Sequence, residues 1–180
     1  MTSYDVVPIG VVVSGRADLI EDHWDHVVTT LELDEAVVGV DATVGLADFS
    51  HAEIVFGFHL STKTRTGLAH PRGNAAWPQV GALSDRGPHR HNHLGVTVCR
   101  LIEIDGLRVT VRGLDAIVGS PIFDVKPYSP ELLPRGEVHG PRWMTELMRD
   151  YYDRVRTSCL RHCSVLIVCD AWRDLTAARR

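Results

Sequence analysis

Residues 94–112, LGVTVCRLIEIDGLRVTVR, decide how this chain folds. On both sides of Asp105-Gly106, aliphatic side chains alternate with small or polar ones, a period of two that is typical of β-strands. An Asp-Gly pair supplies the positive φ angles of a two-residue hairpin turn. The stretch therefore predicts a β-hairpin with its tip at Asp105 and Gly106.

Shorter stretches of similar character surround this hairpin. Each is apolar, rich in β-branched residues or alternating, and we predict strands at 6–14, 28–33, 52–59, 79–84 and 121–126. Residues 36–46 are interpreted as strand and turn. Pro141 suits a first helical position. The apolar residues that follow recur at spacings of three and four and predict one helix over 141–157: Trp143, Leu147, Met148, Tyr151 and Val155. This order predicts a mainly β fold, a small β-barrel or sandwich with one C-terminal helix.

Composition narrows the class of protein. A chain of 180 residues with 44% hydrophobic and 23% charged residues fits one globular domain. The net charge of −4 argues against binding nucleic acid by bulk charge, although a local basic patch is compatible with it. The sequence has no apolar run of about 18 residues and no basic N-terminal signal region, so we expect no membrane contact.

The four cysteines indicate a reducing, cytoplasmic setting, because none forms a Cys-x-x-Cys pair. Three of them lie in residues 158–180, which we interpret as a Cys-rich, irregular tail after a domain that covers residues 1–157. Cys159, His162 and Cys163 could hold a metal, but the sequence offers no matching second half of such a site.

Histidines at alternating positions raise a second metal hypothesis. On a strand, His89, His91 and His93 would share one face and could bind a metal with an open site. Gly87-Pro88 before them and Gly95 after them favour a loop instead, with solvated histidines. No dinucleotide-binding or Walker glycine motif is present, so a nucleotide-like cofactor would bind outside those schemes.

Two segments resemble a known family. Residues 86–95, RGPHRHNHLG, and 113–128, GLDAIVGSPIFDVKPY, are similar to the motifs Arg-Ser-x-x-Arg-Pro-Asn-Pro-Ile-Gly and Gly-Leu-Asp-x-x-x-Gly-Thr-Pro-x-x-Asp-Ile-Lys-Pro-Tyr. These motifs belong to the TrmO-like, or TsaA-like, S-adenosylmethionine-dependent methyltransferases. With further matches upstream, the resemblance covers roughly residues 8–152. His91 and His93 replace the two prolines of the first motif, which removes two φ restraints from the loop.

The resemblance implies a small non-Rossmann β-barrel that binds S-adenosyl-L-methionine, usually as a homodimer with the cofactor near the subunit interface. Matching positions assign the cofactor pocket to Leu60, Ser61, Arg86, Arg90, Asn92, Val96, Arg112, Gly113, Leu114 and Asp115. They assign candidate catalytic groups on the substrate side to Asp124, Lys126 and Tyr128. The implied substrate is transfer RNA, at N6 of the threonylcarbamoyl-modified adenosine beside the anticodon.

Methyl transfer from S-adenosylmethionine requires few catalytic groups from the protein. Arg86 could clamp the methionine carboxylate, and Asp115 could hold a ribose hydroxyl or the ammonium group. Asp124 or Tyr128 could accept the proton that a methylated amine loses, while Asp124 and Lys126 could equally form a structural ion pair. Three alternatives stay open: a small-molecule acceptor, a metal enzyme built on the three histidines, and a non-catalytic cofactor sensor.

Overall fold

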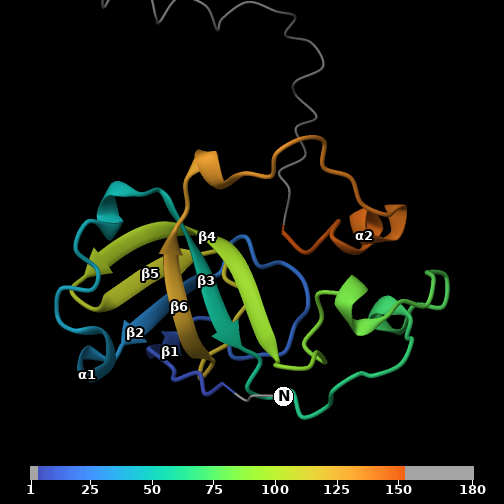
Figure 1. The fold of residues 1–180 in the computed structure, drawn as a ribbon, viewed down its shortest axis with the longest axis horizontal. Helices are drawn as coiled ribbons and strands as arrows, with labels where there is room; N and C mark the ends of the chain where they lie inside the picture. The colour runs from blue at the N-terminus through green and yellow to red at the C-terminus, as the bar shows by residue number, and fades with distance from the viewer. Residues whose placement is uncertain (1–3, 153–180) are drawn as a thin grey trace, which may run out of the picture.

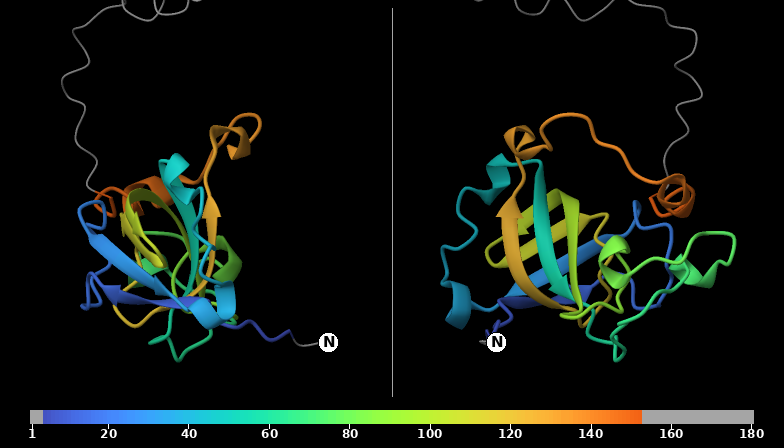
Figure 2. Two further views of the ribbon diagram at one scale, coloured as in Figure 1. Left: turned by 90° about the vertical axis from the view of Figure 1, so that its left-hand side faces the viewer. Right: turned by 45° about the vertical axis from the view of Figure 1, so that its right-hand side comes forward.

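Six antiparallel strands close into a barrel in the computed structural model, which describes residues 4–152 (Figure 1). The strands are β1 (Gly10–Ser14), β2 (Val28–Leu33), β3 (His51–Gly57), β4 (Leu94–Asp105), β5 (Arg108–Arg112) and β6 (Pro121–Pro127). Their order around the barrel is β1-β2-β5-β4-β3-β6. β6 pairs with β1 on one side and with β3 on the other, and Figure 2 shows β6 next to β3. The predicted small β-barrel is confirmed.

The β4–β5 hairpin forms as predicted. Asp105 pairs with Arg108 across the tip, and Gly106 has the positive φ of 55° that the turn requires. The register shifts between Leu101 and Glu103, so β4 carries a bulge there. The predicted strands at 28–33, 52–59 and 121–126 are confirmed within two residues at each end, whereas the first strand begins only at Gly10.

Two predicted strands are wrong. Residues 36–46 begin with α1 (Glu35–Val38), because the Asp34 side chain accepts the Ala36 N–H at 2.9 Å and caps a helical turn; turns and η1 (Leu46–Asp48) follow. Residues 79–84 contain η3 (Ala82–Ser84) and a single bridge between Val80 and Ala69. The closed barrel leaves this segment no free strand edge to join.

The barrel interior holds the core. Its buried side chains come from every strand and from the loop after β5: Val12, Leu31, Leu33, Ala52, Ile54, Phe56, Cys99, Val109, Val111, Leu114, Ala116 and Ile122. On β4 the small residues face inward, and Gly95 lies against the ring of Phe56. A Cβ built on Gly95 would stand 2.3 Å from a ring carbon, so only glycine leaves room for the aromatic side chain.

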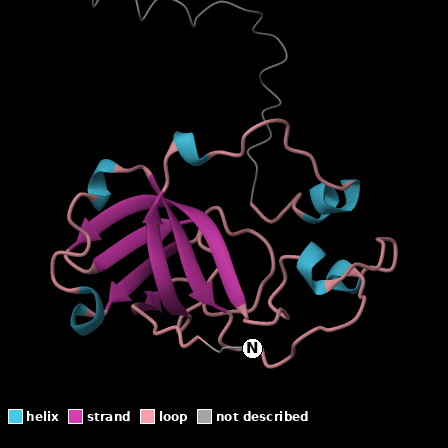
Figure 3. Ribbon diagram, viewed as in Figure 1, coloured by secondary structure: helices cyan, strands magenta, loops and turns pink. Residues whose placement is uncertain are grey.

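The predicted C-terminal helix is shorter than expected within the described part. It is α2 (Arg142–Leu147), and residues 153–157 of the predicted helix lie outside the described residues, as does the 158–180 tail. The helix lies outside the barrel beside the segment that carries η2 (Pro71–Gly73) (Figure 3). There Trp77 Nε1 donates to Glu146 Oε2 at 3.0 Å, and Trp143 is buried. The remaining helical turn, η4 (Pro130–Leu132), follows β6. None of the described helices is long and apolar enough to cross a membrane.

Candidate cofactor and substrate site

The outer face of the barrel brings Val96 and Asp124 into one row. Val96 on β4 pairs with Val55 on β3, and Val55 pairs with Asp124 on β6. Antiparallel partners project from the same face of a sheet, so these three side chains all point outward. Two strand spacings separate the ends of the row, about 10 Å. A substrate lying across Val55 would reach both the predicted cofactor side and the predicted catalytic side.

Lys126 and Tyr128 continue the same outer face. Lys126 pairs with Glu53, and its ammonium forms an ion pair with Asp124. The Tyr128 N–H donates to the His51 carbonyl at 3.0 Å, which extends the strand pairing by one step. The ion pair between Asp124 and Lys126 agrees with the structural interpretation of these two residues, and both side chains remain about half exposed to solvent.

Asp115 lies in the loop after β5 and accepts two hydrogen bonds. One comes from the Thr97 hydroxyl of β4 and the other from the Tyr151 hydroxyl, which follows α2 in the chain. The chain turns at Gly113, whose φ is 89° and whose N–H donates to the Val27 carbonyl at 3.0 Å. Asp115 thus joins the barrel wall to the C-terminal segment.

Burial and this carboxylate keep the neighbouring phenols neutral. Burial, followed by the negative charge of Asp115, raises the pKa of Tyr151 far above its usual value. The pKa of Tyr152 is raised by the same two causes in the same order. Both residues are therefore hydrogen-bond donors at neutral pH.

These shifts predict a loss of stability in alkali. Above about pH 10 the phenols ionise in the unfolded chain but hold their protons in the fold, so the free energy of unfolding falls as pH rises. We expect the fall to be shallower in Tyr151→Phe than in wild type, as measured by urea unfolding at about pH 8 and 10.5. Tyr4→Phe is the matched control, since Tyr4 is 85% exposed. If the free energy of unfolding falls equally between the two pH values in all three proteins, the burial of a neutral Tyr151 is contradicted.

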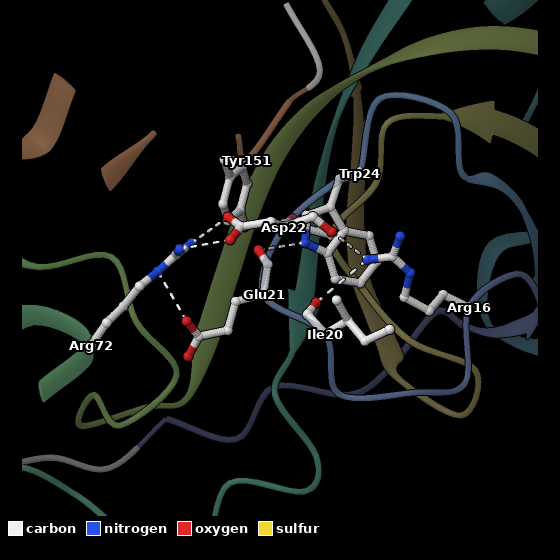
Figure 4. A network of polar contacts seen from close by, with 8 residues as sticks. Arg16, Ile20, Glu21, Asp22, Trp24, Arg72 and Tyr151 are labelled. Atoms are coloured by element: carbon white, nitrogen blue, oxygen red, sulfur yellow. Dashed lines mark hydrogen bonds and ion pairs between the residues drawn. The ribbon is translucent and has the colours of Figure 1, made fainter. Parts of the chain in front are cut away.

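A network of polar contacts holds the segment after α2 against the loop before β2 (Figure 4). The backbone N–H of Trp24 donates to the Tyr151 carbonyl at 2.9 Å. The Arg72 guanidinium lies over the Tyr151 ring, 5.9 Å from its centre. It also donates two hydrogen bonds to the Asp22 carboxylate, at 2.8 and 2.9 Å, and pairs with Glu21 at 3.0 Å. Tyr151 is thereby fixed from both sides.

Trp24 is a packing residue of the loop before β2. Its side chain is 4% exposed, and the Arg16 guanidinium covers it at 4.2 Å from the ring centre (Figure 4). Arg16 also donates to the carbonyls of Asp22 and His23, each at 2.8 Å. The loop before β2 is therefore rigidly held where it meets Tyr151.

A pocket opens on the outer face of the barrel, next to Tyr152. It has a volume of 370 Å³, within the range of roughly 300–1,000 Å³ for ligand pockets. Its lining residues are Asp25, His51, Val98, Arg100, Arg112, Gly113 and Tyr152. Arg86 borders Tyr152, and its Nη2 donates to the Val96 carbonyl at 2.9 Å. Five predicted cofactor residues are thus gathered at this end of the barrel: Arg86, Val96, Arg112, Gly113 and Asp115.

The other predicted cofactor residues have different surroundings. Ser61 Oγ donates to the Pro88 carbonyl at 3.1 Å, and Arg90 donates to the Asp85 carbonyl at 2.8 Å, so both shape the loop before β4. Leu60 and Asn92 are exposed. The Leu114 side chain belongs to the core and is fully buried, which leaves only its backbone for a ligand.

The histidines of the 86–95 segment lie in the loop before β4, so the hypothesis that they share a strand face is wrong. His89 shares a hydrogen bond with Ser61 at 3.1 Å, and His93 shares one with Thr64 at 3.2 Å. His93 has a φ of 49°, in the left-handed region. Within residues 4–152, no three histidine, cysteine or acidic side chains are grouped as metal ligands would be.

Sequence reasoning missed the two tyrosines and Thr97. The sequence placed Tyr151 on the apolar face of a helix, whereas the chain leaves the helix at Leu147 and returns to the barrel. Thr97 gave a usable signal, because it occupies an inward position of β4 and a buried hydroxyl needs a partner. No local pattern identified that partner as Asp115.

Comparison with known proteins identifies the family of this chain. The family profile of the tRNA-methyltransferase O N-terminal domain matches residues 21–132. Human tRNA (adenine(37)-N6)-methyltransferase is 40% identical over 92 residues, which cover 49% of this chain and 20% of the human protein. A Pseudomonas aeruginosa protein provisionally named S-adenosylmethionine-dependent methyltransferase RcsF is 37% identical over 105 residues, covering 56% and 44% of the two chains.

A solved structure supports the same relationship. The crystal structure of TrmO from P. aeruginosa superimposes with a TM-score of 0.64 at 26% identity, covering 79% of this chain and 62% of that one. The matches span less than two thirds of the length of each of these relatives. Because the family profile covers more than half of this sequence, the chain belongs to the tRNA-methyltransferase O N-terminal domain family.

Proposed function

We propose that this protein transfers the methyl group of S-adenosyl-L-methionine to N6 of the adenosine next to the tRNA anticodon, in its threonylcarbamoyl-modified form. The observation that carries the proposal is the family match over residues 21–132. The name of the human relative, which specifies N6 of adenine 37 in tRNA, supports the substrate. The provisional name of the P. aeruginosa relative supports the cofactor.

The side chains near the pocket fit the chemistry of this cofactor. Arg86 donates one N–H to the Val96 carbonyl, so the other N–H groups of its guanidinium can bind a carboxylate. Asp115 accepts one hydrogen bond on each oxygen and keeps lone pairs for an ammonium group or a ribose hydroxyl. Val96 and Tyr152 offer apolar and aromatic surface for an adenine ring.

The substrate side needs an aligned nucleophile and a proton acceptor. The cofactor supplies an activated methyl group on a sulfonium, so the chain must hold the acceptor nitrogen in line with it. Val55 forms the floor between Val96 and Asp124, and we assign it to support the acceptor base. Asp124 takes up the proton that the nitrogen loses, while Lys126 positions this carboxylate through their ion pair. Tyr128 borders the base from the next row.

A homodimer in the cytoplasm completes the proposal. Val96 and Val98 project from the outer face of β4 and are 38% and 41% exposed. Aliphatic side chains exposed next to a pocket are suited to a subunit contact. This placement agrees with a cofactor bound near a subunit interface, and light scattering combined with gel filtration measures the mass directly.

Calorimetric titration with S-adenosyl-L-methionine tests the cofactor site. We expect saturable binding by the wild-type protein and at least a tenfold weaker affinity in Arg86→Ala, because a charge-assisted contact contributes about 1.5–3 kcal/mol. Arg108→Ala is the matched control, since Arg108 is an exposed arginine at the far end of β5. Wild-type affinity in Arg86→Ala would contradict the assignment of its guanidinium to the carboxylate.

Methyl incorporation identifies the acceptor. Labelled S-adenosyl-L-methionine is incubated with transfer RNA carrying the threonylcarbamoyl group, with transfer RNA lacking it, and with a metabolite extract. We expect label in the modified RNA alone. Equal labelling of both RNAs would remove the requirement for the threonylcarbamoyl group, and labelling confined to the extract would assign a small-molecule acceptor and overturn the RNA substrate.

A further inference from the structure

A second row of side chains crosses the outer face of the barrel and forms part of the pocket wall, since Arg112, Arg100 and His51 all line the pocket. Arg112 on β5 pairs with Arg100 on β4, and Arg100 pairs with His51 on β3. The backbone carbonyl of His51 accepts the backbone N–H of Tyr128, which follows β6. Cross-strand partners share a face, so the row presents two guanidinium groups and an imidazole side by side. Its length is three strand spacings, about 14 Å.

The two arginines face each other without an acidic partner. Within residues 4–152, neither guanidinium forms an ion pair or a side-chain hydrogen bond. The nearest carboxylates by position are Asp25, which lines the same pocket, and Glu53, one outward step from His51 along β3. Like charges directly opposite each other destabilise a pair of strands, and an anion bound between them would relieve this repulsion.

We infer that the row formed by Arg112, Arg100, His51 and Tyr128 is a binding site for phosphodiester groups of the RNA substrate. This inference rests on the proposed function and names the part of the pocket wall that would hold the RNA. Planar guanidinium forks suit phosphate oxygens, and an exposed row of this length suits an extended polynucleotide backbone better than one carboxylate. A local basic row also shows how a chain with a net charge of −4 could bind RNA.

The position of the row agrees with its assignment. Arg112 directly precedes Gly113 and the loop that holds Asp115, and Tyr128 lies one outward position beyond Lys126 on the strand that carries Asp124. A backbone bound along the row would therefore run past both the predicted cofactor side and the predicted catalytic side. An unstacked base could turn from it toward Val55, and Tyr128 offers an aromatic face to a neighbouring base.

Fluorescence anisotropy with labelled transfer RNA, measured over a series of salt concentrations, tests the inference. We expect Arg100→Ala to weaken RNA binding about tenfold. The slope of the logarithm of the binding constant against the logarithm of the salt concentration should become shallower by about 0.7–0.9. Arg108→Ala removes the same charge from the same face but lies outside the row. It should change both quantities much less. Because Arg100 also lines the pocket, calorimetry with S-adenosyl-L-methionine is run on the same variant to separate a role in RNA binding from a role in cofactor binding.

The outcomes separate this inference from the proposed function. Equal effects of Arg100→Ala and Arg108→Ala would overturn the site, because a diffuse charge effect would then account for both. A lower cofactor affinity in Arg100→Ala would also overturn it and assign the row to the cofactor carboxylate. If the wild-type protein transfers no methyl group but Arg100→Ala still weakens RNA binding, the phosphate site is supported and the proposed function fails.

Discussion

Gly95→Ala is expected to destabilise the barrel by about 3 kcal/mol and to lower its melting temperature by about 10 °C. The added Cβ would stand 2.3 Å from the ring of Phe56, which is fully buried in the core. Interiors are close-packed, so the ring cannot move aside without disturbing its other neighbours. Urea unfolding that yields both the midpoint and the slope gives the change in free energy.

Two further variants test the cause of this effect. Gly81→Ala should be neutral or slightly stabilising, because a Cβ there meets no atom within 4 Å and the φ of −71° suits any residue. Combining Gly95→Ala with Phe56→Leu should cost less than the sum of the two single changes, since Phe56→Leu removes the ring that the added Cβ would meet. Strict additivity would show that Gly95 is required for a reason other than the aromatic ring.

Asp115→Asn is expected to weaken binding of S-adenosyl-L-methionine between about 10- and 100-fold while leaving the fold intact. The amide keeps the shape of the carboxylate and can still bond the hydroxyls of Thr97 and Tyr151, but it loses the charge that would hold an ammonium group. Asp115→Ala should instead lose stability, because both hydroxyls are left without their acceptor, at about 1–3 kcal/mol each. Calorimetry and thermal unfolding measured on both variants separate the two roles.

One combination of results would refute the binding role of Asp115. If Asp115→Asn binds the cofactor as tightly as the wild type and Asp115→Ala is unstable, the carboxylate serves only to hold Tyr151 on the barrel. Asp115 would then be removed from the predicted cofactor residues.

The hairpin was predictable because its information is local, but its orientation was not. Alternation and Asp105-Gly106 predict two paired strands, yet either face of β4 could have turned inward. The structure buries Gly95, Thr97 and Cys99 and exposes the valines between them. This choice depends on Phe56, a residue on another strand that no window around β4 contains.

The candidate site was predictable where its residues are adjacent in sequence. Arg112 to Asp115 form one motif, and the structure places Arg112 and Gly113 on the pocket and the Leu114 side chain in the core. Their part in binding the cofactor stays a prediction. Tyr151 was assigned to a helix face because its spacing from Leu147 fits a helix, whereas its contact with Asp115 depends on how the chain returns to the barrel. Arg100 drew no attention because its significance lies in its cross-strand partner.

The position of β6 has a consequence for how the protein is made. Gly10 is synthesised early, yet one of its partners, Ile122, lies more than 100 residues later in the chain. One edge of β3 likewise stays unpaired until β6 has been synthesised. Ribosomes add about 5–20 residues per second, so the nascent sheet exposes two unpaired edges for seconds. Exposed strand edges recruit other chains. A fragment that stops before Pro121 should therefore aggregate, and nascent chains of this protein should need chaperone protection until the last strand emerges.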